Sequence, residues 1–372
     1  MDARYTVAEL AAKVGAELHG VGSTAVLGVA PLDDIRPGTV VFAEKDRDVP
    51  AALASSAAAV VASIVPAGGT SRPAILLTPH VRRVFAEICQ LLFGGYPGEA
   101  GGAHPTAVID PSAHLGADVA IGPSVAIGPG CRVGARSVLR ANVVLDEGAS
   151  IGEDCYLFPG VVIGRRSVVG DRVVVHPNAV IGGEGFGFTV GEGPSLKQPQ
   201  FGRVVVGNDC EIGACTTIDR GTLGDTVLGD DVKLDNLVQV GHNCRIGSHV
   251  RVSALTGFSG GAIVEDDCLI GGQVGVQNRV TIGRGCLVGG QSGITHDLPP
   301  GSKVWGTPAH DLRTVLKEIA IVQRLPEIAG RLDALEHRKG GRKGEKGKEG
   351  EKGRKGEKGR KGREGRKGKR GK

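Results

Sequence analysis

The chain has 372 residues, of which 62 are glycine and only 3% are aromatic, a composition that excludes a helical bundle and favours many tight turns around a thin aliphatic core. Its formal net charge of +5 conceals two parts, because residues 338–372 hold 18 Lys and Arg against 5 Glu and carry +13, while the remainder carries −8. An acidic body and a basic tail need separate explanations.

The eight cysteines form no CxxC pair and no small-domain spacing, so we expect a reducing, cytoplasmic setting rather than a disulfide framework. Residues 1–15 lack the apolar core of a signal peptide. The longest apolar run, residues 51–65, is too short to span a bilayer. The sequence therefore predicts a protein that is neither secreted nor membrane-spanning.

Residues 1–103 are expected to form a small α/β domain. Thr6 and Glu9 have the spacing of a capping box for a first helix. Strands are predicted at 39–43, 58–64 and 74–77, and a second helix at 81–93. Gly20 and Gly22 lack a third glycine, so they do not indicate a dinucleotide site.

Residues 104–308 are expected to form a left-handed parallel β-helix, because an apolar residue recurs at every sixth position. This period suits a short strand and a turn, so three hexads make one triangular coil. About nine coils at the strand spacing of about 4.8 Å make a prism roughly 45 Å tall. A β-helix that serves only as a scaffold has the same period. The residues in phase are Ile109, Leu115, Ile121, Ile127, Val133, Leu139, Leu145, Ile151, Leu157, Ile163, Val169, Val175, Ile181, Val206, Ile212, Ile218, Leu228, Leu234, Val240, Ile246, Val252, Phe258, Val264, Ile270, Val276, Ile282, Val288 and Ile294.

The hexads are interrupted between Ile181 and Val206, which predicts a loop thrown out from one corner. This loop carries Phe186 and Phe188, two of the few aromatic residues of the chain. Loops that project from a rigid scaffold commonly carry binding residues, so we expect a substrate-binding role for both rings. A merely decorative insertion is the alternative.

After the prism, residues 309–337 have helical spacing of apolar residues, and Pro326 is expected to break them into two helices. Their apolar face predicts packing against equivalent helices of neighbouring subunits, or a cap on the same chain. In the tail, residues 338–372, glycine falls at every third position from Gly341 to Gly371. That is the period of collagen, but the segment has no proline and a dense positive charge, so we favour a disordered polycation.

An outer face of a β-helix is flat, so a site needs a loop, a second domain or a neighbouring subunit to form a cleft. His242, two residues after inward-facing Val240, is the leading candidate. Taken alone, an exposed histidine is more often only solvated than catalytic. Imidazole nevertheless titrates near neutral pH, which suits a general base.

Three segments decide the interpretation: HPNAVIGGEGFGF at 176–188, QPQFGRVVVGNDCEIGACTTIDRG at 198–221 and DNLVQVGHNCRIG at 235–247. They closely resemble the UDP-3-O-acylglucosamine N-acyltransferases of lipid A biosynthesis, and the resemblance extends from VAELAAKVGAELHG near the N-terminus to GTPA at 306–309. It implies a homotrimer that moves a 3-hydroxyacyl group from acyl carrier protein to the 2-amino group of UDP-3-O-acylglucosamine. It implies no cofactor beyond the phosphopantetheine of that carrier, and no metal.

The resemblance also assigns catalytic residues. His242 matches the family's catalytic histidine, and Asp235 matches a nearby carboxylate that orients the imidazole or, equally, binds backbone in a turn. Gly260 in LTGFSGG is our candidate for the backbone N–H that meets the oxyanion. Asn236 and Gln239 are expected to contact substrate.

Three positions depart from the family's pattern. Arg279 stands where a second histidine is usual, and an arginine can hold a phosphate but cannot exchange a proton. In the N-terminal domain Phe42 matches an aromatic that stacks on uracil, but Lys45 and Asp48 stand at the Asn and Tyr positions that follow it. The nucleotide preference is therefore less firmly predicted than the type of reaction.

Two other classes are weighed against this one. Trimeric β-helix carbonic anhydrases hold zinc with histidines, but His242 and His249 lack the His-x4-His spacing. A non-catalytic scaffold leaves the GHN motif and the Phe loop unexplained. An enzyme of the same fold that acts on another nucleotide-linked amino sugar stays open.

The basic tail predicts contact with an anionic membrane surface, so that the enzyme is cytoplasmic and peripheral at the inner membrane. Acidic carrier protein is a second partner for the same charge. Nucleic acid is expected to bind only nonspecifically. The sequence does not choose among these.

Overall fold

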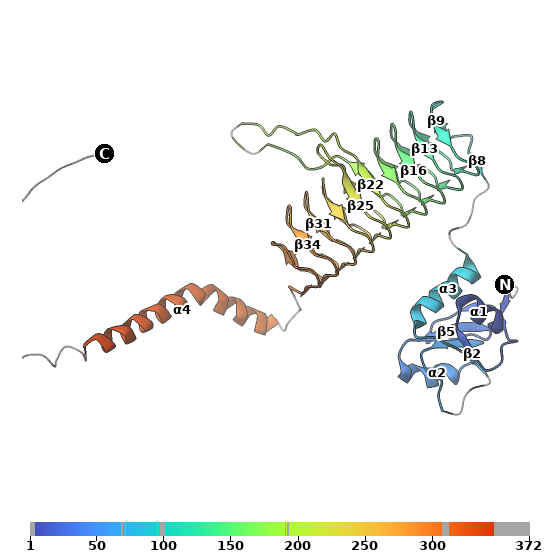
Figure 1. The fold of residues 1–372 in the computed structure, drawn as a ribbon, viewed down its shortest axis with the longest axis horizontal. Helices are drawn as coiled ribbons and strands as arrows, with labels where there is room; N and C mark the ends of the chain where they lie inside the picture. Colours follow the sequence, from blue (N-terminus) through green and yellow to red (C-terminus); the bar gives the residue numbers. More distant parts are fainter. Residues whose placement is uncertain are drawn as a thin grey trace, which may run out of the picture. The chain divides into compact units, whose positions relative to one another are not determined.

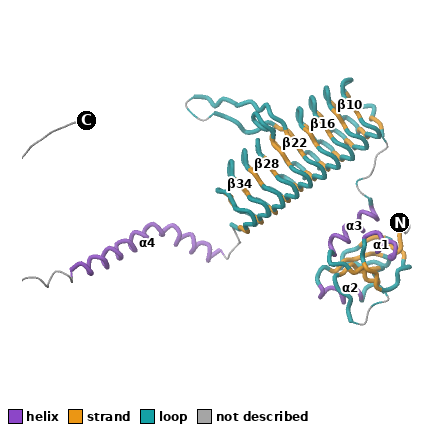
Figure 2. The backbone as a smooth tube through the Cα atoms, in the orientation of Figure 1, coloured by secondary structure: helices purple, strands orange, loops and turns teal. Residues whose placement is uncertain are grey.

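The computed structural model describes residues 4–67, 70, 72–94, 96, 101–189, 191, 193–306 and 312–345. The chain divides into two compact units, Met1–Gly306 and Thr307–Lys372. The first unit contains an N-terminal α/β domain and a solenoid of short strands (Figures 1 and 2). No helix among the described residues combines the length and hydropathy needed to cross a bilayer.

The N-terminal domain is built on a five-stranded sheet in the order β2-β7-β6-β5-β4, in which only β2 is antiparallel to its neighbour. The expected capping box is present, with Thr6 Oγ1 accepting from Glu9 N and Glu9 Oε2 accepting from Thr6 N. The elements are β1 Tyr5–Thr6, α1 Val7–Val14, β2 Glu17–His19, β3 Ala25–Val26, β4 Gly28–Val29, β5 Thr39–Ala43, a 3-10 turn Asp46–Asp48, α2 Val49–Leu53, β6 Ala59–Ala62, β7 Ala74–Leu77 and α3 Val81–Phe93. The predicted strands and helices are thus confirmed, with the middle strand shorter than expected.

The solenoid is a parallel β-helix with three faces, each a sheet of very short strands, as the hexads predict. The nine-stranded face consists of β10 His114–Leu115, β13 Arg132–Val133, β16 Ser150–Ile151, β19 Val168–Val169, β22 Val204–Val206, β25 Thr226–Leu228, β28 Arg245–Ile246, β31 Ile263–Val264 and β34 Thr281–Ile282. The ten-stranded face consists of β9 Val108–Ile109, β12 Ala126–Ile127, β15 Val144–Leu145, β18 Val162–Ile163, β21 Val180–Gly183, β24 Thr217–Asp219, β27 Gln239–Val240, β30 Gly257–Phe258, β33 Gly275–Val276 and β36 Gly293–Ile294. The eleven-stranded face consists of β8 Gly102–Ala103, β11 Ala120–Ile121, β14 Val138–Leu139, β17 Tyr156–Leu157, β20 Val174–Val175, β23 Glu211–Ile212, β26 Lys233–Leu234, β29 Arg251–Val252, β32 Leu269–Ile270, β35 Leu287–Val288 and β37 Lys303–Val304.

The apolar residues of the hexads point into the prism and form one continuous core from Val119 to Leu298. The first coil is the exception, because Leu115 is 40% exposed where no earlier coil covers it. Strand β8 already pairs with β11, so the solenoid begins at Gly102, just before the expected boundary at residue 104. The fold class is confirmed.

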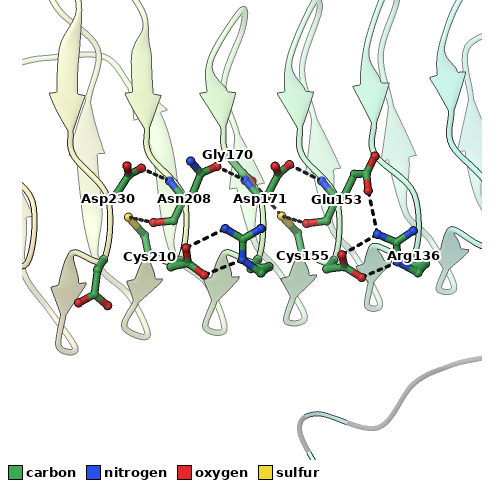
Figure 3. A network of polar contacts seen from close by, with 12 residues as sticks. Arg136, Glu153, Cys155, Gly170, Asp171, Asn208, Cys210 and Asp230 are labelled. Atoms are coloured by element: carbon green, nitrogen blue, oxygen red, sulfur yellow. Dashed lines mark hydrogen bonds and ion pairs between the residues drawn. The ribbon is translucent and has the colours of Figure 1, made fainter.

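The corners are held by a repeated polar ladder (Figure 3). Asp171 Oδ1 accepts from Glu153 N at 2.8 Å, and Asn208 Oδ1 accepts from Asp171 N at 2.9 Å. Arg136 donates to Asp154 through Nε and Nη2, each at 2.7 Å. Each of these hydrogen bonds joins one coil to the next. The corners are therefore rigid, and side chains that point outward from them have fixed positions.

The second unit contains one described helix, so the expectation of two helices was wrong. A single helix, α4 Leu312–Glu345, runs through Pro326, and Figure 1 draws it as one bent rod. A proline inside a helix removes one N–H and clashes with the carbonyl four residues earlier, at a cost of about 3 kcal/mol, but flanking helix formers let the helix bend instead of ending. The helix also includes residues 338–345, the start of the basic tail, where we expected disorder; residues 346–372 lie outside the described residues.

Candidate functional site

A cavity of about 520 Å³ opens on the ten-stranded face, beneath the root of the loop between β21 and β22. His242 lies on its wall, at the corner that follows β27. The residues that line it are Phe186, Asp219, Gln239, Gly241, His242, Gly257, Phe258, Ser259, Gly260, Gly275, Val276, Gln277 and Asn278. The cavity is thus lined by an imidazole from His242, a carboxylate from Asp219 and the backbone of several glycines.

The Nδ1 side of the His242 imidazole faces two oxygens. Asn243 Oδ1 lies 3.1 Å from Nδ1, and Thr222 Oγ1 lies 3.4 Å from it. The amide of Asn243 is oriented by the backbone, because its Oδ1 also accepts from Thr222 N at 3.0 Å. The hydroxyl of Thr222 gives its proton to Gln200 Oε1 at 2.7 Å. Both oxygens therefore act as acceptors toward the ring.

This arrangement fixes the tautomer of the neutral imidazole. With two acceptors at Nδ1, the proton resides there, and the lone pair is left on Nε2. An imidazole held in this form can take a proton through Nε2 without first rearranging. His242 therefore has the geometry of a general base.

Gly260 and Gly185 both lie against the side chain of His242. A Cβ on Gly260 would fall 2.5 Å from His242 Nε2, and a Cβ on Gly185 would fall 2.8 Å from His242 Cβ. Gly260 thus lies on the wall of the cavity beside the free nitrogen, where we expected the oxyanion donor. Gly185 carries the loop directly over the histidine, which explains the glycine-rich start of that loop.

Asp219 faces the same cavity from the preceding coil. Burial raises its pKa to about 6, against the opposing effects of a hydrogen bond from Gln239 and of nearby His242. Gln239 Nε2 donates to Asp219 Oδ2 at 2.8 Å, while Gln239 Oε1 accepts from the hydroxyl of Thr217. Gln239 therefore lines the cavity and holds Asp219, while its expected contact with substrate stays a prediction.

In the three strands of the ten-stranded face that follow His242, a glycine stands at the outward position, so no side chain covers the backbone there. Gly257, Gly275 and Gly293 are paired in register in successive strands, and a Cβ on any of them would meet nothing within 4 Å. The first two line the cavity. They leave a strip of exposed backbone that extends away from Nε2.

Asp235 and Asn236 are separated from His242 in this chain. Asp235 Oδ1 accepts from Asn236 N at 2.8 Å and its Oδ2 from Ala254 N at 3.1 Å, while Asn236 Oδ1 accepts from Ala214 N at 2.7 Å. Both line a different pocket of about 450 Å³, which opens at the eleven-stranded face. Within one chain, Asp235 is the turn carboxylate of our alternative interpretation.

The remaining candidates lie at or outside the rim. Phe186 lines the cavity and is 84% exposed, whereas Phe188 packs against it with ring centroids 5.1 Å apart and does not line the cavity. Arg279 is exposed at the corner beside Gly261, and its N donates to Gly260 O at 3.2 Å. Its neighbours Gln277 and Asn278 line the cavity instead.

In the N-terminal domain, Phe42 on β5 packs on Phe85 with ring centroids 4.6 Å apart. Lys45 is exposed, and Asp48 forms an ion pair with Arg47 at 3.7 Å. These three residues share no described contact with the His242 cavity.

The sequence did not single out Asp219, although it lies in GACTTIDRG. A signal was present in the spacing of the hexads. The step from Ile218 to Leu228 is ten residues instead of six, so Ile218 pairs with Val240 one coil on, and Asp219 comes to lie beside His242. Thr222 was likewise missed, because only the fold brings its hydroxyl to Nδ1. Asn243 follows His242 directly, but the sequence does not show that its amide oxygen faces the ring.

The chain matches three family models. The model described as GMPPB C-terminal domain matches residues 102–184. The model of the bacterial transferase hexapeptide with six repeats matches residues 225–260, and that of the hexapeptide repeat of succinyl-transferase matches residues 261–295. All three lie in the solenoid.

Among curated relatives, the UDP-3-O-acylglucosamine N-acyltransferase of Methylobacillus flagellatus is 37% identical over 337 residues, which cover 90% of this chain and 96% of the relative. A protein of the same name from Methylorubrum extorquens is 46% identical over 154 residues, which cover 41% of this chain and 44% of the relative. That second alignment spans less than half of the relative.

Among solved structures, the UDP-N-acetylglucosamine acyltransferase of Arabidopsis is 26% identical and aligns with a TM-score of 0.51. The alignment covers 55% of this chain and 71% of the other.

Proposed function

Because the chain belongs to the family of UDP-3-O-acylglucosamine N-acyltransferases, we propose that it transfers a 3-hydroxyacyl group from acyl carrier protein to the 2-amino group of UDP-3-O-acylglucosamine. The observation that carries the proposal is the orientation of His242, whose Nδ1 faces two acceptors while its Nε2 lies beside Gly260. The reaction needs a base at that point, since an attacking amine must lose a proton.

The proposed step balances as follows. The amine nitrogen attacks the thioester carbonyl carbon, a C–N bond forms, and His242 Nε2 takes the amine proton. The oxyanion is met by the backbone N–H of Gly260, a donor that needs no reorganisation as charge develops. When the C–S bond breaks, the imidazolium returns its proton to the thiolate of the phosphopantetheine.

Asp219 has a place in this scheme as the carboxylate across the cavity. Its negative charge stabilises the imidazolium that forms during the reaction. In a single chain, Asp219 and not Asp235 is positioned for this. Gln239 orients it by donating to Oδ2.

The acyl chain is proposed to lie along the glycine strip of Gly257, Gly275 and Gly293. Exposed backbone without side chains offers a flat path that begins at the free Nε2. Phe186, 84% exposed on the loop above, would cover apolar substrate there. The uridine is assigned to the N-terminal domain around Phe42.

We propose a homotrimer with the acyl carrier as a transient partner. The α4 helix supports this, because several of its apolar side chains are exposed: Leu316, Ile319, Val322, Leu325, Leu332 and Leu335 are each 48% to 61% exposed. Helices of three copies packed together would bury them. The cytoplasmic location is proposed from the spacing of the cysteines, and the peripheral contact with the inner membrane from the charge of the basic tail.

The proposed function is tested by mass spectrometry of products from the purified full chain with UDP-3-O-acylglucosamine and 3-hydroxyacyl carrier protein. We expect an N-acylated product and its loss in His242→Ala. Lys45 and Asp48 give a specific reason to test a second acceptor, so other UDP-linked amino sugars are run in parallel. A product with one of those alone would assign another acceptor, and no product with any from a folded oligomer would contradict the function.

A further inference from the structure

Three side chains on the outer surface of the eleven-stranded face are buried although they point away from the core. Ala120, Val138 and Tyr156 are 2%, 6% and 6% exposed. Each is the first residue of its strand, and side chains alternate along a strand, so these point outward while the hexad residue points inward. At the same strand position near the other end of this face, Leu269 and Leu287 are 45% and 43% exposed. These three side chains pack together on the outside of the prism, with Phe158 and Val174 against them.

Tyr96 is the described residue that lies there. It belongs to the segment that joins α3, which ends at Phe93, to β8, which begins at Gly102. Its ring stacks on Tyr156 with centroids 4.9 Å apart and planes inclined by 27°. It also meets the edge of Phe158 at 5.1 Å and of His176 at 6.3 Å.

The pKa of Tyr96 is raised, first by burial and then by the negative charge of nearby Glu211. Glu211 is itself held by His176, whose Nε2 lies 2.8 Å from Oε1. Tyr96 thus contacts an aromatic surface formed by Tyr156, Phe158 and His176, which we call the seat, and it lies near a carboxylate.

The seat is built independently of Tyr96. Arg140 Nη1 donates to the hydroxyl of Tyr156 at 2.6 Å. Phe158 and His176 stack on each other with centroids 5.0 Å apart and an interplanar angle of 13°. These contacts join successive coils, so the surface that receives Tyr96 is rigid.

The seat lies several strands beyond Gly102, where the solenoid begins. Strand β8 pairs with β11, β11 with β14 and β14 with β17, so Tyr156 is three strands from Gly102, about 14 Å at the strand spacing. The residues from Tyr96 to Gly102 can span about 20 Å at most. This seat is therefore within reach, and only Gly94 and Gly95 separate it from the end of α3.

We propose that Tyr96 is a positioning residue: it pins the interdomain segment to the outer face of the β-helix and so shortens the tether of the N-terminal domain from the eight residues 94–101 to the two glycines 94 and 95. The proposal rests on the proposed function in one respect, that the N-terminal domain brings the nucleotide end of the acceptor. A shorter tether confines that domain to a smaller volume around the solenoid, and so raises its effective concentration at a site that the tether still reaches.

The kinetic test compares Tyr96→Ala with Tyr96→Phe and with the matched control Phe93→Ala. Phe93 is also aromatic and 51% exposed, and it makes no ring contact among the described residues. Each aromatic pair corresponds to roughly a two- to tenfold change in an equilibrium constant. We therefore expect Tyr96→Ala to raise KM for UDP-3-O-acylglucosamine about tenfold with kcat and the donor KM within about twofold, and the other two variants to stay within about threefold of the parent.

A structural test works even if the chain has no such transferase activity. Glu99 follows Tyr96 in the sequence between the two domains, and a glutamate-specific protease that cuts after it releases residues 1–99. Cleavage follows the population of the released segment, so Tyr96→Ala should give this fragment about tenfold faster, while Phe93→Ala matches the parent. An unchanged cleavage rate in Tyr96→Ala overturns the pin. Faster cleavage with an unchanged KM for the acceptor keeps the pin and overturns its role in positioning the acceptor.

Discussion

The Cα of Gly260 lies so close to the imidazole of His242 that a Cβ added to it would stand 2.5 Å from Nε2 and 2.6 Å from Cε1. The atom that would clash is the one that is free to take a proton. The two residues are adjacent in space because Val240 pairs with Phe258 one coil on, and each of these lies two residues before the corner that carries His242 or Gly260.

Gly260→Ala should therefore lower kcat by about 100-fold, the order expected when a base or an oxyanion donor is displaced. The matched control is Gly28→Ala, in β4 of the N-terminal domain, where an added Cβ also meets nothing within 4 Å. We expect that control to keep its kcat within about threefold. Steady-state kinetics with circular dichroism of both variants gives the answer, and equal activity of the two would contradict the placement of Gly260 beside a catalytic nitrogen.

Asn243→Ala tests the tautomer. Removing Oδ1 takes away the acceptor that lies 3.1 Å from Nδ1 and frees the Thr222 N–H that it also binds. The imidazole then loses its bias toward a lone pair on Nε2, so kcat should fall about 10- to 100-fold with little change in KM. Nitrogen NMR of the histidine should show the Nδ1-protonated form in the parent and a mixture in the variant; a parent protonated on Nε2 would rule out this tautomer.

Much of this site and fold could be predicted from the sequence, for reasons tied to particular residues. The period of six alone predicted that the side chain of Val240 points into the core and that of His242 points outward. Alternation along the strand and the turn at the corner determine both directions. Phe186 and Gly260 followed from the interrupted hexads and from the coil after His242. Helix α1 followed from Thr6 and Glu9 alone.

The rest depended on distances that no local pattern contains. Asp219 lies beside His242 because the coil from Ile218 to Val240 has 22 residues instead of 18. Asp235 lies about one hexad before His242 and therefore at another corner. Pro326 was expected to end a helix, but the cost of one proline is smaller than the combined preference of the long segment around it.

Asp219→Asn should make the fold more stable at neutral pH while slowing the reaction. Burial raises the pKa of Asp219 in the folded chain to about 6, from 3.8. The folded state therefore binds this proton more tightly than the unfolded state, so this residue lowers the free energy of unfolding progressively as pH rises from about 4 to about 6, and fully above that. The amide removes this cost, so Tm should rise by about 1 to 3 °C at pH 7.5 and hardly at pH 4.

The same variant should lower kcat about tenfold at pH 7.5, because the imidazolium loses its opposing charge. Thermal unfolding at the two pH values and kinetics on the same samples are the measurements. A lower Tm at pH 7.5 would show that the carboxylate is stabilising and that its pKa is not raised.

Gly275→Val tests the path of the acyl chain. An added Cβ meets nothing within 4 Å, so the fold should accept it, and the side chain should stand on the strip that leads away from His242. Long acyl donors should lose kcat/KM about 10- to 100-fold, since each displaced methylene costs about 0.8 kcal/mol of apolar burial, whereas short donors should lose less than about threefold. The same loss for all donor lengths would place the acyl chain elsewhere.

The cysteines should differ sharply in reactivity. Six are buried in the core, and burial raises the pKa of the Cys155, Cys210 and Cys244 thiols to about 11. Their thiols also donate to backbone carbonyls of other coils, as Cys155 Sγ does to Gly170 O at 3.1 Å (Figure 3). Because only the thiolate is nucleophilic, these residues should resist iodoacetamide at pH 8, while exposed Cys215 reacts first. Peptide mass spectrometry after timed labelling reads out each site. Early alkylation of Cys155 or Cys210 in the native protein would mean that the coils open on that timescale, and the rigid corners on which the placement of His242 depends would have to be abandoned.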